Sequence, residues 1–512
     1  MRCHSERARL LVLGALILLL VNGPYLAAYG LSDPPRFGGI LFALQDGYSY
    51  LAKMRAGWRG EWLFTLPYTA EPGAGAALMT YYLFLGHLAR WTGASLDLIY
   101  HLARVVNGGL FLGAAYAVLG RVEPEPGARR RLWLIFVLSG GLGWLALPWL
   151  SLPPDFWIAE SIPFLTLISN AHFPLMWALL LATLTLTAPG LAPEGLSARR
   201  LAAAGALTLL LGLVQPMALA PLGVTLVGAT AWQVWEHRTN PVRAWLPVLV
   251  VGVCAAPWVL NAWWAVQTLP VLRAWNAQNL TPSPPLAQAV VWGGLPLLAA
   301  LPGLWVAARR RTALDRLCVS WLVLGVLLLY APLALQRRLA VGLWLPLCAL
   351  AWIGWREVLA PWFAGRRRPL ALAGVLALGL SNGFVWAALL AGVLTRTPDY
   401  FFTRDEAAAL DWLAAQAGRP VVLAGPELSL AIPARSDARV IYGHDFETVN
   451  AAEQKAAVLA FYAGGQPAQP FLDEQGVDLV LVGPRERALG PEPDLADWRR
   501  VFEQGTVAVY GR

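Results

Sequence analysis

The stretch LLVLGALILLLVNGPYLAAYGLS occupies residues 10–32 and contains no charged residue. A transmembrane helix needs roughly 20 apolar residues to cross the ~30 Å hydrocarbon core of a bilayer, so this stretch is long enough to span it. No small-residue cleavage site lies at a convincing position near it. We therefore expect a retained first transmembrane helix rather than a removed signal peptide.

The composition of the whole chain places more than this helix in a membrane. Of its 512 residues, 57% are hydrophobic and 14% are charged, which is too apolar for a water-soluble globular protein. The net charge of +8 is carried mostly by arginines in short clusters between apolar segments, as in loops that stay in the cytoplasm. We expect no nucleic-acid partner. The four cysteines lack paired or metal-like spacing, so neither a disulfide framework nor a zinc site is predicted.

The arginine clusters also predict how the chain is oriented. Arginines before residue 10 put the N-terminus in the cytoplasm, and the later clusters then require even numbers of crossings between them. The result is a polytopic α-helical protein of about eleven transmembrane helices, with its C-terminus outside. Abundant arginine, alanine and leucine with few lysines indicate a GC-rich bacterial genome, hence a bacterial plasma membrane. The predicted spans are 10–32, 98–120, 132–150, 173–187, two within 201–235 broken at Gln215-Pro216, 244–264, 287–308, 317–335, 339–355 and 369–395.

The first outer loop, 33–75, contains Asp46-Gly47-Tyr48-Ser49-Tyr50-Leu51-Ala52-Lys53-Met54. If 47–57 is helical, Asp46, Tyr50 and Lys53 share one face because residues three and four apart are neighbours on a helix. An acidic residue in this loop is a candidate catalytic carboxylate, and Tyr50 and Lys53 are candidate substrate-binding residues. The alternative is that Asp46 only caps the helix, since Asp is a strong N-cap residue.

The second outer loop and one late arginine pair supply further candidates. Glu160 is a second candidate catalytic carboxylate, at the membrane surface, where charge is costly unless it is hydrated, paired or bound to a cation. His172 is a candidate binding residue, although a lone histidine is more often a satisfied interfacial side chain. Arg337 and Arg338 fall on the outer side, where two adjacent guanidiniums form a fork for a phosphate group. The alternative for this pair is anchoring at lipid headgroups.

Asp46 with Tyr50-Leu51-Ala52-Lys53-Met54, then Gly57, Trp62 and Tyr68-Thr69-Ala70-Glu71-Pro72, resembles the first-loop region of the C-type (GT-C) membrane glycosyltransferases. The likeness is greatest to the protein-mannosyltransferase-like branch common in bacteria, and it covers roughly residues 10–395. It implies inverting transfer of a sugar from a polyprenyl-phosphate-linked donor on the outer face, with a first-loop aspartate as base or acceptor-orienting group. Asp46 is the matching position. Protein mannosyltransferases proper carry an Asp-Glu pair there, whereas Gly47 follows here, so protein mannosylation is not implied.

Residues 396–512 change to a composition typical of soluble domains. Thr403 and Glu406 form a predicted capping box for a helix at 404–417, and a second helix is predicted at 451–462. β-branched runs at 421–423, 440–442, 477–482 and 507–510 alternate with these helices, so we expect a small α/β domain outside the membrane. The string Gly-His-Asp-Phe-Glu-Thr at 443–448 resembles a segment of outer domains in bacterial transferase-like proteins. Its residues favour a turn followed by a helix start.

The sequence thus predicts a membrane glycosyltransferase that moves a hexose or pentose from a polyprenyl-phosphate-linked donor to an extracytoplasmic acceptor, a glycolipid, polysaccharide or protein. Such a displacement needs a carboxylate for the attacking hydroxyl and positive charge for the departing phosphate. A divalent cation held by Asp46 and Glu160 is an alternative source of that charge, although no dense acidic motif demands a metal. Two other functions remain open, a lipid or solute transporter and a non-catalytic envelope-binding protein with a degenerate transferase fold.

Overall fold

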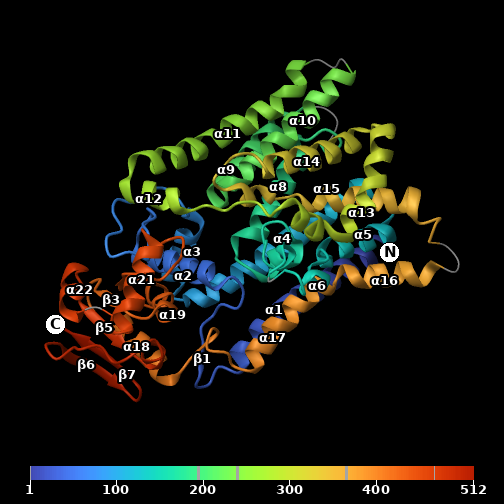
Figure 1. Cartoon of the computed structure of the whole chain (residues 1–512). Helices are drawn as coiled ribbons and strands as arrows, with labels where there is room; N and C mark the ends of the chain where they lie inside the picture. Colours follow the sequence, from blue (N-terminus) through green and yellow to red (C-terminus); the bar gives the residue numbers. More distant parts are fainter. Residues whose placement is uncertain (1, 151, 193–195, 238–240, 364–366, 466) are drawn as a thin grey trace. The chain divides into compact units, whose positions relative to one another are not determined.

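The computed structural model describes residues 2–150, 152–192, 196–237, 241–363, 367–465 and 467–512. The chain divides into two compact units, each made of segments far apart in the sequence (Figure 1). The first unit comprises Met1–Asn22, Leu102–Leu260 and Thr281–Ala388, and the second comprises Gly23–His101, Asn261–Leu280 and Leu389–Arg512. This division differs from the predicted one at residue 395, because the first outer loop belongs to the same compact unit as the C-terminal residues.

The first unit consists of helices and contains most of the apolar chain. Its elements, including helices that continue into the second unit, are α1 (Arg2–Gly30), α4 (Leu96–Val122), α5 (Pro126–Leu138), α6 (Gly143–Ala146), η1 (Pro154–Phe156), α7 (Pro163–Ile168), α8 (His172–Thr187), α9 (Ala198–Val214), η2 (Pro216–Ala218), α10 (Leu219–His237), α11 (Pro241–Thr268), α13 (Leu286–Arg310), α14 (Ala313–Leu329), η3 (Gln336–Ala340), α15 (Trp344–Gly354), η4 (Trp355–Leu359), α16 (Arg368–Leu378) and α17 (Leu380–Leu394).

The length and apolarity of these helices make the chain a multi-pass membrane protein. Among the described residues, five helices are long and apolar enough to cross a bilayer, or six if the bent pair α16 and α17 forms one span. Helices occur in every predicted span, but several are shorter than about 20 residues. The span predicted at 132–150, for example, is interrupted after Leu138 by Gly140-Gly141 before the short α6. The count of eleven therefore stays a prediction.

Two features show how local sequence sets this helical architecture. The predicted break at Gln215-Pro216 is confirmed, since α9 ends at Val214 and a short 3₁₀ turn precedes α10.

In the packing of α13 with α15, a Cβ on Gly303 would lie 1.9 Å from the carbonyl oxygen of Leu350. Glycine at this point therefore lets two helix backbones approach closely, as small residues do in membrane proteins.

The second unit combines helices at 44–59, 80–92 and 270–278 with the C-terminal α/β fold (Figure 1). A five-stranded sheet has the order β4-β3-β5-β7-β6, with β4, β3 and β5 parallel and β7 and β6 joined antiparallel. A separate antiparallel pair joins β1 to β2, which lies far along the chain. The elements are β1 (Arg36–Phe37), α2 (Leu44–Arg59), α3 (Thr80–Thr92), α12 (Pro270–Gln278), β2 (Phe401–Phe402), α18 (Arg404–Ala414), β3 (Val421–Leu423), α19 (Pro426–Ser429), α20 (Ile432–Arg435), β4 (Arg439–Val440), α21 (Ala451–Tyr462), α22 (Ala468–Glu474), β5 (Leu479–Val482), α23 (Pro484–Arg487), β6 (Arg499–Gln504) and β7 (Val507–Gly511).

The C-terminal secondary structure follows the sequence signals closely. The capping box of Thr403 and Glu406 is present at the start of α18, and α21 has the predicted bounds. The predicted β-branched runs all contain strands, whereas β6, which is mostly exposed, was not predicted. Burial of strand residues such as Val422 and Val480 against the covering helices stabilises the domain through loss of apolar surface from water.

Candidate functional site

Asp46 lies in the first turn of α2, within the second unit. Helix α2 begins at Leu44 and its N-cap is Ala43, which has a left-handed backbone with φ 51° and no side-chain capping bond. Asp46 is therefore inside the helix, and the alternative that it serves as the N-cap is wrong. Its side chain is half-buried, and no residue in the described part of the chain forms a hydrogen bond with its carboxylate. Asp46 stays a predicted catalytic residue.

Close packing against α3 fixes the position of α2. A Cβ on Gly57 would lie 2.0 Å from the carbonyl oxygen of Leu83, and one on Gly86 would lie 1.9 Å from that of Met54. The two glycines therefore allow direct backbone contact between the helices. Tyr50, a predicted binding residue, is 8% exposed, and its ring stacks on Tyr82 with centroids 4.1 Å apart. Its contacts hold α2 against α3.

Lys53, another predicted binding residue, makes a buried ion pair with the C-terminal domain. Its Nζ lies 2.6 Å from Oε1 of Glu447, and the Lys53 and Glu447 side chains are 1% and 9% exposed. Ser49 Oγ donates to the same Glu447 oxygen at 2.8 Å and accepts a hydrogen bond from Lys53. Burial would raise the pKa of Glu447, but the neighbouring ammonium of Lys53 leaves that pKa below its usual value. The pair therefore links α2 to the C-terminal domain, and Lys53 stays a predicted substrate-binding residue.

Glu447 belongs to the string at 443–448, which folds as a tight turn. The backbone N–H groups of Gly443 and His444 donate to Thr448 Oγ1 at 3.2 and 3.3 Å. The backbone N–H groups of Phe446 and Glu447 donate to Nδ1 of His444 at 3.0 and 3.1 Å. The predicted turn is confirmed, but the helix that follows begins only at Ala451. What the sequence did not indicate is that this turn docks on α2.

Two further contacts hold the turn. Gln45 Nε2 donates to Asp445 Oδ2 at 2.7 Å, and Tyr442 and Lys455 donate to the other Asp445 oxygen at 2.6 and 3.2 Å. Burial would raise the pKa of Asp445, but these donors lower that pKa to about 2. On the other side, Gln278 Nε2 donates to the carbonyl oxygens of Phe446 and Thr448. The turn is thus held from both α2 and α12.

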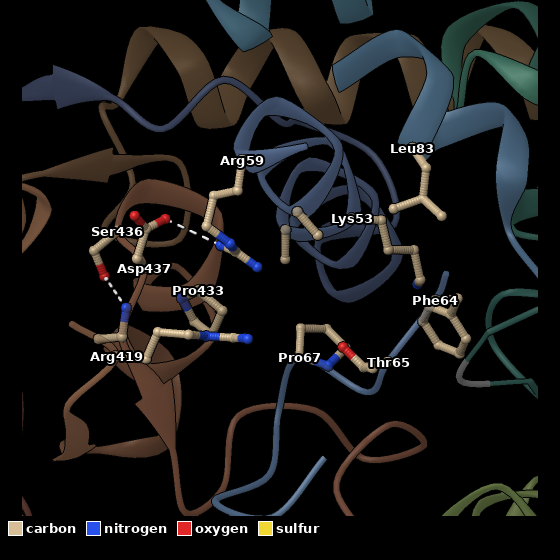
Figure 2. A pocket seen from close by; sticks show the side chains of 13 residues that line it. Lys53, Arg59, Phe64, Thr65, Pro67, Leu83, Arg419, Pro433, Ser436 and Asp437 are labelled. Carbon is tan, nitrogen blue, oxygen red and sulfur yellow. Dashed lines mark hydrogen bonds and ion pairs between the residues drawn. The ribbon is translucent and has the colours of Figure 1, made fainter. Parts of the chain in front are cut away.

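A cavity of about 20 Å³ lies beside α2. It is lined by residues of α2, of the loop that follows it, of α3 and of the C-terminal domain. Figure 2 shows Arg59 pointing toward Asp437 at its edge, and the two side chains lie 3.0 Å apart. Arg55 also binds Asp437, at 2.8 Å. A cavity of this size holds about one water molecule, so it is a gap between paired charges and not a sugar-binding pocket.

A second polar cluster lies in the first unit. The guanidinium of Arg337 stacks over the Trp157 ring with 4.5 Å between the guanidinium carbon and the ring centroid, and its Nε lies 3.8 Å from Oε1 of Glu160. Trp177 Nε1 donates to the backbone oxygen of Glu160 at 3.2 Å, which fixes that segment. Arg338, next in the chain, is half-buried. The structure therefore brings together two of the predicted residues, Glu160 and Arg337.

His172 begins α8 in the first unit. It is 4% exposed, and its ring lies 4.1 Å from that of Phe173. A group of three or more His, Cys, Asp or Glu side chains that could hold a metal ion does not occur among the described residues. The predicted cation stays a prediction. Residues that the sequence did not single out are Ser49, His444, Glu447 and Trp157, of which His444 and Glu447 stood in the quoted string at 443–448.

Comparison with known proteins gives no match to any protein-family model and none to a curated protein sequence. Solved structures do match. The oligosaccharyltransferase of Archaeoglobus fulgidus in its apo form aligns with a TM-score of 0.57 at 12% identity, over 93% of this chain and 69% of that one. A structure of the same protein, AglB, with an inhibitory peptide and a dolichol-phosphate aligns with a TM-score of 0.54 at 13% identity, covering 94% of this chain and 69% of that one.

Arabinofuranosyltransferase AftD from Mycobacteria aligns with a TM-score of 0.56 at 17% identity. The alignment covers 99% of this chain but 40% of AftD, so the chain spans about two fifths of that protein. Both neighbours are GT-C glycosyltransferases, and the fold that the first loop suggested is confirmed. At these identities the likeness shows the fold.

Proposed function

We propose that this protein is a glycosyltransferase that moves a sugar from a polyprenyl-phosphate-linked donor to an acceptor hydroxyl outside the cytoplasm. The observation that carries the proposal is the state of Asp46, a half-buried first-loop carboxylate with no hydrogen bond from the described residues, on a helix that is otherwise firmly held. The shared fold supports it, because AftD is an arabinofuranosyltransferase and AglB has been seen with a dolichol-phosphate.

Asp46 supplies the base in this proposal. A carboxylate oxygen of Asp46 takes the proton of the acceptor hydroxyl while the hydroxyl oxygen forms a bond to the anomeric carbon of the sugar. The bond between that carbon and the phosphate oxygen breaks, and its electron pair leaves with the polyprenyl phosphate. Attack from the face opposite the phosphate inverts the anomeric centre.

Arg337 and Arg338 are proposed to bind the donor phosphate. A guanidinium remains charged at any physiological pH and presents several N–H donors in one plane, which suits phosphate oxygens. Stacking on Trp157 holds the plane of Arg337, whose Nε lies 3.8 Å from the Glu160 carboxylate, beyond hydrogen-bond distance. In this scheme the predicted catalytic residue Glu160 acts by orienting Arg337, and His172 stays a predicted substrate-binding residue.

The test measures sugar transfer by the full chain in membranes, with a panel of labelled polyprenyl-phosphate sugars as donors. Asp46→Asn should reduce transfer by roughly 100-fold or more, the usual effect of losing a general base. Asp33→Asn is the control, because Asp33 is an exposed carboxylate in the same loop. Full activity of Asp46→Asn would remove Asp46 from the mechanism. Absence of transfer by the unaltered protein from every donor would favour a transporter or a non-catalytic binding protein.

A further inference from the structure

His444 is a buried histidine of defined tautomer in the turn at 443–448. Its side chain is 2% exposed, and Nδ1 accepts hydrogen bonds from the backbone N–H groups of Phe446 and Glu447. An imidazole nitrogen that accepts cannot carry the proton, so the neutral ring bears its hydrogen on Nε2. The edge of the ring that carries Nε2–H is therefore a hydrogen-bond donor.

The Nε2–H donor of His444 has no hydrogen-bond partner in the described part of the chain, although Nε2 is buried. Buried donors in native proteins are nearly always paired, and one that is not calls for a functional explanation. Tyr68, whose ring lies 5.4 Å from that of His444, donates its hydroxyl hydrogen to the carbonyl oxygen of Leu430, and its hydroxyl oxygen makes no hydrogen bond with Nε2 of His444. The strongest acceptors in the turn and at the start of α2 are carboxylates, which form charge-assisted hydrogen bonds.

Gln45 and Ser49 of α2 donate to Asp445 and Glu447 at 2.7 and 2.8 Å, which brings the first turn of α2, with Asp46, against the turn that contains His444. Three carboxylates therefore belong to these two contacting segments, those of Glu447, Asp46 and Asp445. Asp445 accepts from Gln45, Tyr442 and Lys455, so its oxygens are engaged. Glu447 Oε1 accepts from Lys53 and Ser49, while its Oε2 is buried without a partner in the described chain. Asp46 is the one of the three for which the described residues provide no side-chain hydrogen bond. It is also the residue to which the proposed function assigns the proton transfer.

We infer that His444 is a positioning residue for Asp46, and that its Nε2–H donates a hydrogen bond to one oxygen of the Asp46 carboxylate while the acceptor substrate is bound. This inference rests on the proposed function. The other Asp46 oxygen is then directed at the acceptor hydroxyl and takes its proton, and His444 keeps its own. Lys53, Ser49 and Glu447 hold the turn on α2, so the His444 ring stands on a segment that is fixed to the helix carrying Asp46.

Two substitutions separate this role from simple support of the turn. In His444→Asn the amide oxygen replaces Nδ1 as acceptor for the two backbone N–H groups, as Asx turns do, but no donor reaches the Nε2 position. In His444→Gln the amide nitrogen reaches about that position. We expect His444→Asn to retain the melting temperature and the KM values while kcat falls roughly 10- to 100-fold, the effect of a misdirected catalytic group. His444→Gln should recover much of the loss.

His87→Asn is the matched control, because His87 is a 4% exposed histidine of the same unit whose Nε2 lies 3.0 Å from the carbonyl oxygen of Glu61. Unchanged kcat in His444→Asn would overturn the inference. A second measurement combines His444→Asn with Asp46→Glu. If His444 acts through Asp46, the decreases in kcat caused by the two substitutions are not additive. Additive decreases would mean that His444 Nε2–H donates to Glu447 instead of Asp46, which would also overturn the inference. An Asp46→Asn variant with full activity would instead disprove the proposed function.

Discussion

Lys53 Nζ lies 2.6 Å from Glu447 Oε1, although 394 residues separate the two in the chain. The pair joins the helix that carries Asp46 to a turn of the C-terminal domain, and both side chains are almost fully buried. The C-terminal domain therefore helps to set the environment of the candidate catalytic carboxylate. Substitutions of Lys53 and Glu447 can therefore test how much this contact stabilises the second unit.

Lys53→Met should destabilise the second unit strongly. It leaves the Glu447 carboxylate buried without its cation, and breaking a buried pair typically lowers the free energy of unfolding by about 3–5 kcal/mol. The double variant Lys53→Met with Glu447→Leu removes both charges and should be more stable than Lys53→Met alone. The stabilities of the single and the double variant are measured by denaturant unfolding in detergent, with limited proteolysis as the readout of unfolding. Arg36→Met is the control, because the Arg36–Asp411 pair is exposed and such pairs contribute about 0–1 kcal/mol.

Acid should loosen the second unit in two stages. Burial lowers the pKa of His444 below 6.5, so as the pH falls below 6.5 the unfolded chain takes up a proton that the folded chain does not, and stability decreases. The pKa of Glu447 is lowered from 4.5 because Lys53 outweighs its burial, so its contribution is present above pH 4.5 and is lost as the pH falls through the folded value.

Melting temperatures measured from pH 8 to pH 3 check this. They should decline first below pH 6.5 and then more steeply below pH 4.5. His444→Asn should remove the first decline and retain the second. A melting temperature that stays constant between pH 6.5 and pH 4.5 in the unaltered protein would contradict the role given to His444 burial.

Gly86→Ala should separate α2 from α3. The added Cβ would lie 1.9 Å from the carbonyl oxygen of Met54, and a backbone atom cannot move aside as a flexible side chain can. We expect destabilisation of about 1–3 kcal/mol, as for overpacking in other cores, together with loss of transfer. Gly109→Ala is the control, because a Cβ on Gly109 meets nothing within 4 Å among the described residues. Equal stability of the two variants would mean that the helices are not in backbone contact.

Arg337→Lys should weaken binding of the donor. A lysine keeps the charge but loses the planar guanidinium that stacks on Trp157, so the donor KM should rise roughly tenfold while the acceptor KM stays the same. Trp157→Ala should have a similar effect for the same reason. Arg499→Lys on the exposed surface of β6 serves as the control. If instead the acceptor KM rose, Arg337 would belong to acceptor binding.

Several elements could be predicted because their signals are local. The break at Gln215-Pro216, the capping box at Thr403 and the helix α21 each depend on residues within a few positions of one another. The membrane class follows from the composition alone. By contrast, Lys53 was predicted to bind substrate because it shares a helix face with Asp46, and nothing nearby in the sequence indicated that Glu447 would also contact it.

The sequence by itself therefore determined that this is a membrane protein with a C-terminal α/β fold and a polar, aromatic-rich loop after its first helix, since hydropathy, capping and β-branched runs act over short distances along the chain. Only the tertiary structure decided that α2 packs on the turn at 443–448, that Lys53 pairs with Glu447 and that His444 is buried in that turn. These relationships depend on residues hundreds of positions apart. Burial of charge and hydrogen-bond pairing in the folded chain select them, and no local pattern specifies them.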